Sequence, residues 1–402
     1  MTSHDNIHSQ HYPASSHSAE TFSWLEYNMH LIKIAFVTTF GLHQVLSATA
    51  DHKMLSEEQQ HILLCVSNIA NKYFFPESSL LVSLPPEQED EVFTKPLLPL
   101  DIPRYDELLV SFLLREMNQG SRWCLQISRP GASTMEMQEY VFVKHHNYIV
   151  FTWTDQPDGD VLGNLMDQMD ELRFSLAMNS RARFIFVVAG QISSVTSDLA
   201  RDIADKLWTE YNIIDAVILI PRKETANSEG IHSDVAIIDI YFWVPYQTDG
   251  MCSDNSVSLI DKWIGGSEGR FLNGAFLFPN KTPSKFRGCS LTASAAKSEP
   301  VFVTVSNDTD ANNNIRHIYG GLEIEYFKLY SEAMNVSVIY KPPPPGDAVK
   351  QRIDLVLNLQ DGLLDVAFGA IPIHPVITAI ADPTIIHVNE QMKWCSGAHG
   401  YG

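Results

Sequence analysis

The chain has 402 residues, enough for two domains, and its hydrophobic (45%) and charged (19%) fractions are those of folded protein rather than long disorder. Its net charge is -20, and no Lys/Arg cluster stands out. Because a phosphate-binding face needs concentrated positive charge, this composition excludes nucleic acid as an expected partner. The five cysteines form no CxxC pair, which leaves a zinc cluster or a thioredoxin-type site without support. We predict neither a metal centre nor a cofactor.

The N-terminal 50 residues predict secretion. Lys33 precedes an apolar core, Ile34–Leu42, and Ala48–Ala50 has the small-x-small form of a signal-peptidase site. The core is too short to span a bilayer, which takes about 20 apolar residues, and no other stretch reaches that length, so we expect an ectodomain without an anchor. A polar leader rich in His and Ser precedes it, so we expect translation to begin at Met29. The alternative for the apolar core is a buried apolar helix. For the leader histidines we expect a disordered polar tail, and metal binding is the alternative.

Residues 51–245 predict an α/β domain in which strands and helices alternate. Near-continuous apolar runs are typical of strands that are covered on both faces. These runs are Arg183–Ala189, Ala216–Ile220 and Val235–Val244. Helical spacing occurs before and between them, and the βαβα order predicts a parallel sheet flanked by helices. No GxGxxG follows a strand, and Walker A, GxSxG and HExxH motifs do not occur in the sequence, so nothing indicates a nucleotide site or a common hydrolase.

Residues 246–289 predict a linker, because Pro, Gly and aromatic residues recur there at loop spacing. Cys252 and Cys289 flank this segment and are candidate disulfide partners in a secreted chain. The odd number of cysteines fits two disulfides plus one thiol whose partner lies elsewhere, and it also fits five buried reduced cysteines. Three sequons give the candidate glycosylation sites Asn280, Asn307 and Asn335, of which the first is weakened by the Pro at position 283.

Residues 290–402 predict the beginning of a second α/β unit. Leu322–Met334 has helical spacing, with Leu322, Tyr326, Leu329, Tyr330 and Ala333 on one face and two acids in the first turn. Gly362–Trp394 predicts a buried strand over Leu363–Ile371 and a small-residue turn, followed by Asp382-Pro383-Thr384.

Two stretches in this unit, YGGLEIEYFKLYSEAMNVSVIY and GLLDVAFGAIPIHPVITAIADPT, resemble the first ligand-binding segment of ionotropic glutamate receptors. IYFWVPYQTDGMC, LIDKWIGG, FPNKTPSKFRGC and MKWC are similar to motifs of the divergent ionotropic receptors of insects, which serve chemosensation. The resemblance covers residues 235–395 and extends upstream in outline. It implies a periplasmic-binding-protein-like clamshell amino-terminal domain, followed by an incomplete first lobe segment of a ligand-binding domain, without the transmembrane pore.

The resemblance carries over the receptor frame but not the amino-acid clamp. In glutamate-binding members, an Arg twelve positions after the strand Asp grips the ligand carboxylate. Counting from Asp365 places Ile377 there, while the Asp expected five positions later is present as Asp382. Tyr319 matches an aromatic that covers the ligand, although it would also fit as a packed residue at a helix entry. The implied ligand-binding candidates are Tyr319, Ile377 and Thr384, for a ligand other than an α-amino acid or for no direct ligand.

The leading hypothesis is therefore the extracellular portion of a ligand-gated cation-channel-type chemosensory receptor, a glycoprotein of the plasma membrane. A small-molecule ligand would close the clamshell, and co-receptor subunits would complete a hetero-oligomeric channel. This fragment alone would be secreted. The alternatives are a secreted soluble α/β ligand-binding protein and, less favoured, an α/β enzyme using Asp365, His374 and Asp382, although the two acids fit better as a strand-start residue and a turn cap. We expect no enzymatic activity.

Overall fold

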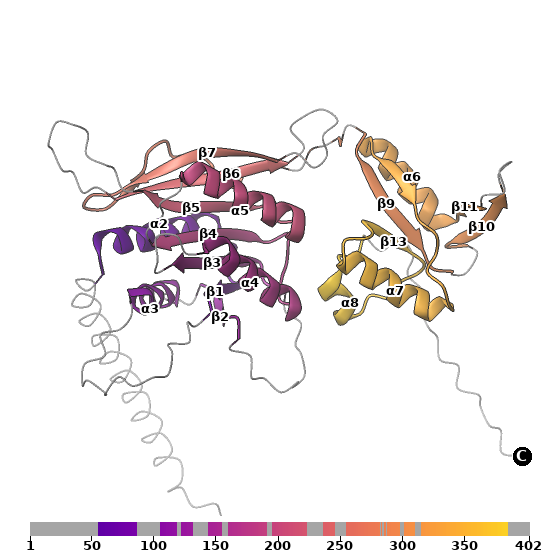
Figure 1. Ribbon diagram of the computed structural model, residues 1–402, viewed down its shortest axis with the longest axis horizontal. Helices are drawn as coiled ribbons and strands as arrows, with labels where there is room; N and C mark the ends of the chain where they lie inside the picture. Colours follow the sequence, from indigo (N-terminus) through magenta and orange to yellow (C-terminus); the bar gives the residue numbers. More distant parts are fainter. Residues whose placement is uncertain are drawn as a thin grey trace, which may run out of the picture. The chain divides into compact units, whose positions relative to one another are not determined.

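The computed structural model describes residues 55–86, 105–118, 122–131, 144–154, 160–190, 195–222, 236–245, 255–281, 283, 285–286, 288–297, 301–309 and 315–384. The predicted signal peptide, Cys252 and the MKWC motif lie outside these residues. The described chain is mixed α/β, with one eight-stranded sheet, one three-stranded sheet and one two-stranded hairpin (Figure 1). We call residues 55–281 the large-sheet region and residues 285–384 the small-sheet region.

The large sheet has the strand order β2-β1-β3-β4-β5-β6-β7-β8. Its parallel strands are β1 (Ser79–Ser83), β2 (Cys124–Ser128), β3 (Asn147–Thr154), β4 (Arg183–Gly190) and β5 (Ala216–Arg222). The antiparallel strands that follow are β6 (Ile237–Pro245), β7 (Asn255–Ile264) and β8 (Arg270–Phe271). The helices of this region are α2 (Glu57–Tyr73), α3 (Tyr105–Asn118), α4 (Val161–Phe174) and α5 (Thr196–Tyr211).

Both faces of the central strands β3, β4 and β5 are buried, as the apolar runs predicted. On one face, rings on β3 and β4 pack against the apolar sides of α4 and α5. Tyr148 stacks on Phe184 at 4.4 Å between ring centroids, and Phe184 stacks on Phe186 at 5.6 Å. The side chains between them, including Ile185 and Val187, point to the opposite face and are fully buried too. A parallel sheet whose strands are covered on both faces accounts for this pattern.

The expected linker over 246–289 contains a strand, which differs from the prediction. β7 pairs with β6 along Ile237–Pro245 and adds to the large sheet. Much of β7 is half-exposed or exposed, with Asp261 and Trp263 as its buried residues. A strand covered on only part of its surface has no continuous apolar run, so its sequence resembles a loop.

The described residues of the large-sheet region form one sheet, whereas a clamshell would have two lobes, each with its own sheet. The prediction of an α/β fold is confirmed at this coarser level. The described helices include none that is long and apolar enough to cross a membrane.

Two buried charged side chains hold the end of the large-sheet region. The Asp261 carboxylate accepts backbone hydrogen bonds from Lys262 (2.8 Å), Asn273 (2.9 Å) and Ala275 (2.8 Å), which ties the segment after β8 to β7. Lys281 is 6% exposed, and its Nζ donates to the carbonyls of Ile214 (2.7 Å) and Ala216 (3.1 Å). This ammonium also lies 5.0 Å from the centre of the Trp243 ring. Desolvation lowers the pKa of Lys281 to about 8, and the Asp215 carboxylate partly offsets that effect.

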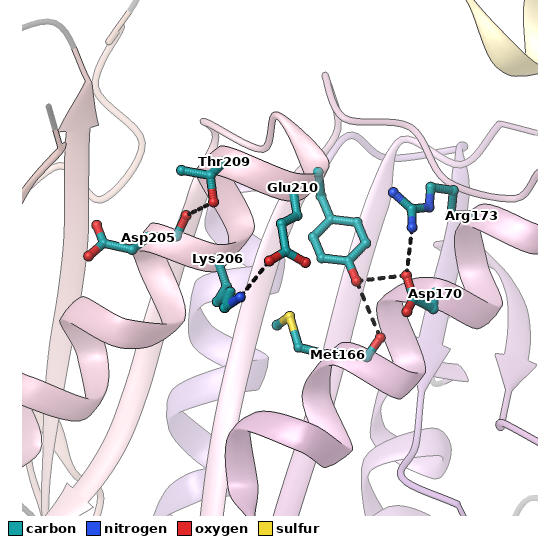
Figure 2. A network of polar contacts seen from close by, with 8 residues as sticks. Met166, Asp170, Arg173, Asp205, Lys206, Thr209 and Glu210 are labelled. Atoms are coloured by element: carbon teal, nitrogen blue, oxygen red, sulfur yellow. Dashed lines mark hydrogen bonds and ion pairs between the residues drawn. The ribbon is translucent and has the colours of Figure 1, made fainter. Parts of the chain in front are cut away.

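Tyr211, near the end of α5, connects α5 to α4. Its hydroxyl donates to Asp170 Oδ1 (2.9 Å). The same oxygen accepts a bond from Arg173 Nη2 (2.9 Å), which Figure 2 shows. The Arg173 guanidinium lies 5.2 Å from the centre of the Tyr211 ring. Burial and the bond to Asp170 raise the pKa of Tyr211. The pair Lys206–Glu210 (2.5 Å) in the same view is an exposed i,i+4 contact within α5.

The small-sheet region has three parallel strands in the order β12-β9-β13, joined through helices (Figure 1). Its strands are β9 (Ser290–Ala295), β12 (Ser337–Tyr340) and β13 (Val366–Phe368), and its hairpin is β10 (Thr304–Thr309) with β11 (Ile315–Gly320). Its helices are α6 (Leu322–Met334), α7 (Ala348–Gln360) and α8 (Pro375–Ile380). The chain runs from β9 through α6 to β12, and then through α7 to β13 on the other side of β9.

The predicted apolar face of α6 is its exposed face. Tyr326 is 39%, Leu329 64% and Tyr330 49% exposed. Ile324 is buried instead, with Phe327 packed partly buried against the same core. The sequence of α6 is apolar on two sides, so the spacing alone did not determine which side meets the sheet.

Candidate functional site

In open α/β sheets, ligands bind outside the carboxyl ends of the strands at the point where the strand order reverses. The large sheet reverses between β1 and β3. The loops that follow these two strands, 87–104 and 155–159, lie outside the described residues. The side chain of Ser83, at the end of β1, is engaged in a buried bond to Gln168 Oε1 (2.9 Å).

The small sheet reverses between β9 and β13. Its switch point comprises the ends of these strands, Ala295–Lys297 and Phe368–Ala370, and the Ala296 N–H donates to the Phe368 carbonyl there (2.9 Å). Gly369 has φ 125° and Ala370 has φ 50°, so the chain turns sharply after β13. A Cβ on Gly369 would lie 2.9 Å from the Ala296 side chain and carbonyl oxygen, so the turn requires glycine.

One carboxylate occupies both backbone N–H groups of this turn. Gly369 N donates to Glu323 Oε2 and Ala370 N donates to Glu323 Oε1, each at 2.9 Å. Glu323 is half-buried and belongs to the first turn of α6. Backbone N–H groups that converge on one anion form a binding arrangement that proteins use for phosphate and carboxylate ligands. Here the anion comes from the chain itself.

The start of α6 is fixed where Glu323 can reach the turn. Gly321 precedes the helix with φ 104°, and a Cβ there would lie 2.4 Å from the Phe302 carbonyl oxygen. The Leu322 and Glu323 N–H groups donate to the carbonyls of Val301 (2.9 Å) and Phe302 (3.2 Å). The N-terminal amides of α6 are thus bound to the preceding segment, and the Glu323 side chain is left for the turn after β13.

Helix α7 holds the other groups at the switch point. Arg352 Nε donates to the Gly369 carbonyl (2.8 Å). Gln351 is 3% exposed; its Oε1 accepts from Lys297 N (2.8 Å) and its Nε2 donates to the Pro344 carbonyl (2.7 Å). Both strand ends are therefore positioned by side chains from two helices.

The structure places the three predicted ligand-binding residues on separate elements. Tyr319, at the end of β11, is buried; its hydroxyl donates to the Lys341 carbonyl and its ring stacks on Tyr340 at 4.9 Å. Desolvation raises the pKa of Tyr319. Ile377 is half-buried in α8, and Thr384 is exposed beyond that helix. The Tyr319 ring is thus packed and its hydroxyl is engaged within the chain, while the ligand-binding roles of the three residues stay predictions.

The acids considered for an enzyme have different surroundings. Asp365 Oδ2 accepts from Thr292 N (2.7 Å) and Thr292 Oγ1 (2.8 Å), which aligns the start of β13 with β9. His374 and Asp382 follow the other end of that strand and are exposed. Asp365 is therefore the strand-start residue that the sequence suggested. Nowhere in the described ranges do three or more His, Cys, Asp or Glu side chains gather to hold a metal ion.

The candidate modification sites lie at the surface. Asn280 and Asn335 are exposed, and Asn307 is exposed with its Oδ1 within 2.8 Å of His317 Nδ1. Cys289 is disulfide-bonded, whereas Cys65 and Cys124 are free. Pairing of Cys289 with Cys252 remains a prediction.

Sequence reasoning missed Glu323 as a residue of the switch point and treated it as an acid favourable to the helix dipole. Its partners lie 46 and 47 positions away. Both contacts are to backbone N–H groups, so the side chains at the partner positions do not indicate them. The available signal was the acid two positions after Gly321 at a helix start.

No family model matches the sequence, and no curated protein matches it. Solved structures that are similar include the AvGluR1 ligand-binding domain in complexes with serine, phenylalanine and methionine. The serine complex is 23% identical, covers 25% of this chain and 37% of its own, and has a TM-score of 0.21. The other two are 22% identical with the same TM-score. The chain thus spans little more than a third of the length of these domains.

Proposed function

We propose that this chain is the extracellular portion of a ligand-gated chemosensory receptor of the divergent ionotropic type, and not an enzyme. The small-sheet region would form part of one lobe of a ligand-binding clamshell, with the ligand at its switch point. The large-sheet region would supply one lobe of the amino-terminal domain. The full receptor would reside in the plasma membrane with this portion outside the cell, and would work with co-receptor subunits.

The observation that carries the proposal is the order β12-β9-β13, in which two helical crossovers place the carboxyl ends of β9 and β13 side by side. That arrangement is where α/β sheets bind ligands. Two of its strands, β12 and β13, lie in the two sequence stretches that resemble the first ligand-binding segment of the receptors, whereas β9 precedes both stretches. Gly369, Ala370 and Glu323 belong to these same stretches, so the resemblance includes the β13 side of the switch point.

Ligand sensing would be a population shift between open and closed clamshell states. The ligand must bind the closed state more tightly, since equal affinity for both states would shift nothing. The position that carries the clamping Arg in glutamate-binding relatives is Ile377 here, which cannot form ionic contacts with a carboxylate. The proposed ligand is therefore a small molecule other than glutamate.

The channel proposal is tested first on the transcript. Full-length RNA should encode three apolar segments of about 20 residues and a second lobe downstream of this chain. The receptor should then be expressed with candidate co-receptor subunits, and currents recorded against panels of acids, amines and amino acids. Cells that express the co-receptor alone are the control. A strong glutamate response would contradict the interpretation of Ile377, and a stop codon after Gly402 in the RNA would favour a secreted binding protein.

Localisation is tested on the 402-residue chain in insect cells. We expect the chain in the medium, with a new N-terminus after Ala50 and a mass that falls on deglycosylation. Asn307→Gln and Asn335→Gln should each remove one glycan. Retention of residues 1–50 in an intracellular product would contradict secretion.

A further inference from the structure

Glu323 makes contacts that a helix-capping acid does not need. An acid in the first turn stabilises a helix through the dipole or through that helix's own N–H groups. Glu323 instead spans to the turn after β13 and uses one oxygen for each of two N–H groups at 2.9 Å. These bonds are charge-assisted and bidentate, which makes them stronger than neutral backbone bonds.

The two N–H groups lie where an anionic ligand of the small sheet would be expected. They are the first two beyond β13, at the strand reversal, and they converge because Gly369 and Ala370 adopt left-handed backbone conformations. Pro372 follows shortly and has no N–H to offer. The Gly369 and Ala370 N–H groups are both used within the chain.

We propose that Glu323 is a specificity-determining residue that acts as a built-in carboxylate, excluding carboxylate ligands from the switch point and selecting small amines and neutral polar molecules. The inference rests on the proposed receptor function, because it concerns the same site. A ligand carboxylate would have to displace one that the fold already holds in place, against its high effective concentration. It would also meet a like charge, whereas an amine would meet an unlike one.

The test uses the secreted chain with ¹³C-carbonyl phenylalanine and ¹⁵N-glycine. Phe-Gly occurs in the sequence at Phe40-Gly41 and Phe368-Gly369, and removal of the signal peptide leaves the second pair, so one amide signal reports on Gly369. Sodium acetate is the anionic probe, methylammonium chloride the cationic probe, and sodium chloride the ionic-strength reference. The proteins compared are wild type, Glu323→Ala, Glu323→Gln and Glu325→Ala.

In wild type, the Gly369 amide should not respond to acetate beyond the sodium chloride reference. In Glu323→Ala it should shift saturably, with an acetate affinity at least tenfold tighter than in wild type, because both N–H groups are free. Glu325→Ala is the matched control: it removes the same charge two residues away from an exposed side chain that pairs with Lys328 (2.7 Å), and it should behave as wild type.

Glu323→Gln guards against a folding defect in the alanine variant. Glutamine keeps one acceptor oxygen, so the turn should stay in place and acetate should bind more weakly than to Glu323→Ala. An equal acetate response in wild type and Glu323→Ala would overturn the inference. It would also be overturned if Glu323→Gln is folded and neither Glu323→Gln nor Glu323→Ala binds acetate. These amide shifts require no channel gating. A failure of this inference can therefore be distinguished from a failure of the proposed receptor function, which is tested by currents in the full receptor.

Discussion

The eight-stranded and the three-stranded sheets of this chain are held together by different means. The large sheet buries rings and branched side chains such as Tyr148, Phe184 and Ile185 on both of its faces. The central strand of the small sheet contributes Ala293 and Ala295 to a core of few residues, beside Phe368. Its strand ends are instead fixed by polar side chains from the neighbouring helices. The difference shows that an α/β sheet can be stabilised mainly by apolar burial, as in the large sheet. In the small sheet, polar contacts at the strand ends contribute a larger share.

The largest expected effect separates the two sheets directly. Phe184→Ala removes a fully buried ring that stacks on two others, and should cost about 3–5 kcal/mol of local stability. Phe368→Ala removes a ring that is 7% exposed and has one ring partner, Phe327 at 5.1 Å, and should cost less. Hydrogen exchange read by mass spectrometry on peptides of each region measures both. Equal losses would remove the distinction between the sheets.

The second prediction concerns a polar contact inside the large-sheet region. Asp261→Ala leaves three backbone N–H groups without their acceptor and should cost about 3 kcal/mol. The loss should appear as faster amide exchange at Asn273 and Ala275. Asp361→Ala, at an exposed helix end, serves as a charge-matched control. A loss as small as that of the control would show that apolar burial alone holds β7 in the large sheet.

The third prediction is a pH dependence that involves Lys281. Its pKa of about 8 in the folded chain lies below the ordinary 10.5, so below pH 8 both states are protonated and the cost of burying the charge is fully present. Between pH 8 and 10.5 the unfolded state binds more protons, so stability should rise, by on the order of 3 kcal/mol. Lys281→Met should lack this rise in denaturant titrations of the large-sheet region. Parallel pH profiles for the two proteins would contradict the assignment.

The smallest effects are expected in the network between α4 and α5. Tyr211→Phe removes the hydroxyl bond to Asp170 and should cost about 1 kcal/mol. Lys206→Ala breaks an exposed pair on the same helix and should cost less than about 0.5 kcal/mol. Denaturant midpoints of the two variants provide the comparison. A larger loss of stability in Lys206→Ala than in Tyr211→Phe would show that the exposed ion pair stabilises this region more than the buried hydroxyl bond does.

The large sheet was largely predictable from the sequence, and the reasons are physical. Arg183–Ala189 and Ala216–Ile220 are strands covered on both faces, so their apolar runs have one consistent interpretation. β7 was read as part of a linker because only part of its surface is covered. Partial burial weakens the hydrophobic periodicity from which a strand is predicted.

The small sheet was predictable only partly as elements and not as a site. The buried strand predicted over Leu363–Ile371 is the shorter β13, Val366–Phe368, and Leu363 is exposed. The helix Leu322–Met334 was correctly located, yet its buried face was assigned to the wrong side because both sides are apolar. Tyr319 was left open between two roles; its ring is buried, and its contact with a ligand stays a prediction. Glu323 could not be connected to Gly369 from the sequence, because a contact from a side chain to a distant backbone N–H depends on the turn conformation.

The two hydrogen bonds from the turn after β13 to Glu323 have a consequence for the sequences of related proteins. A relative that holds a ligand carboxylate with the same two amides must have a residue other than Asp or Glu at the position of Glu323, since both anions cannot occupy one pair of donors. Glycine at the position of Gly369 should persist in both kinds of relative, because the backbone demands it whichever anion is bound. On the proposed function, gain or loss of a single acid at one helix start would then mark where the accepted ligands changed among such relatives.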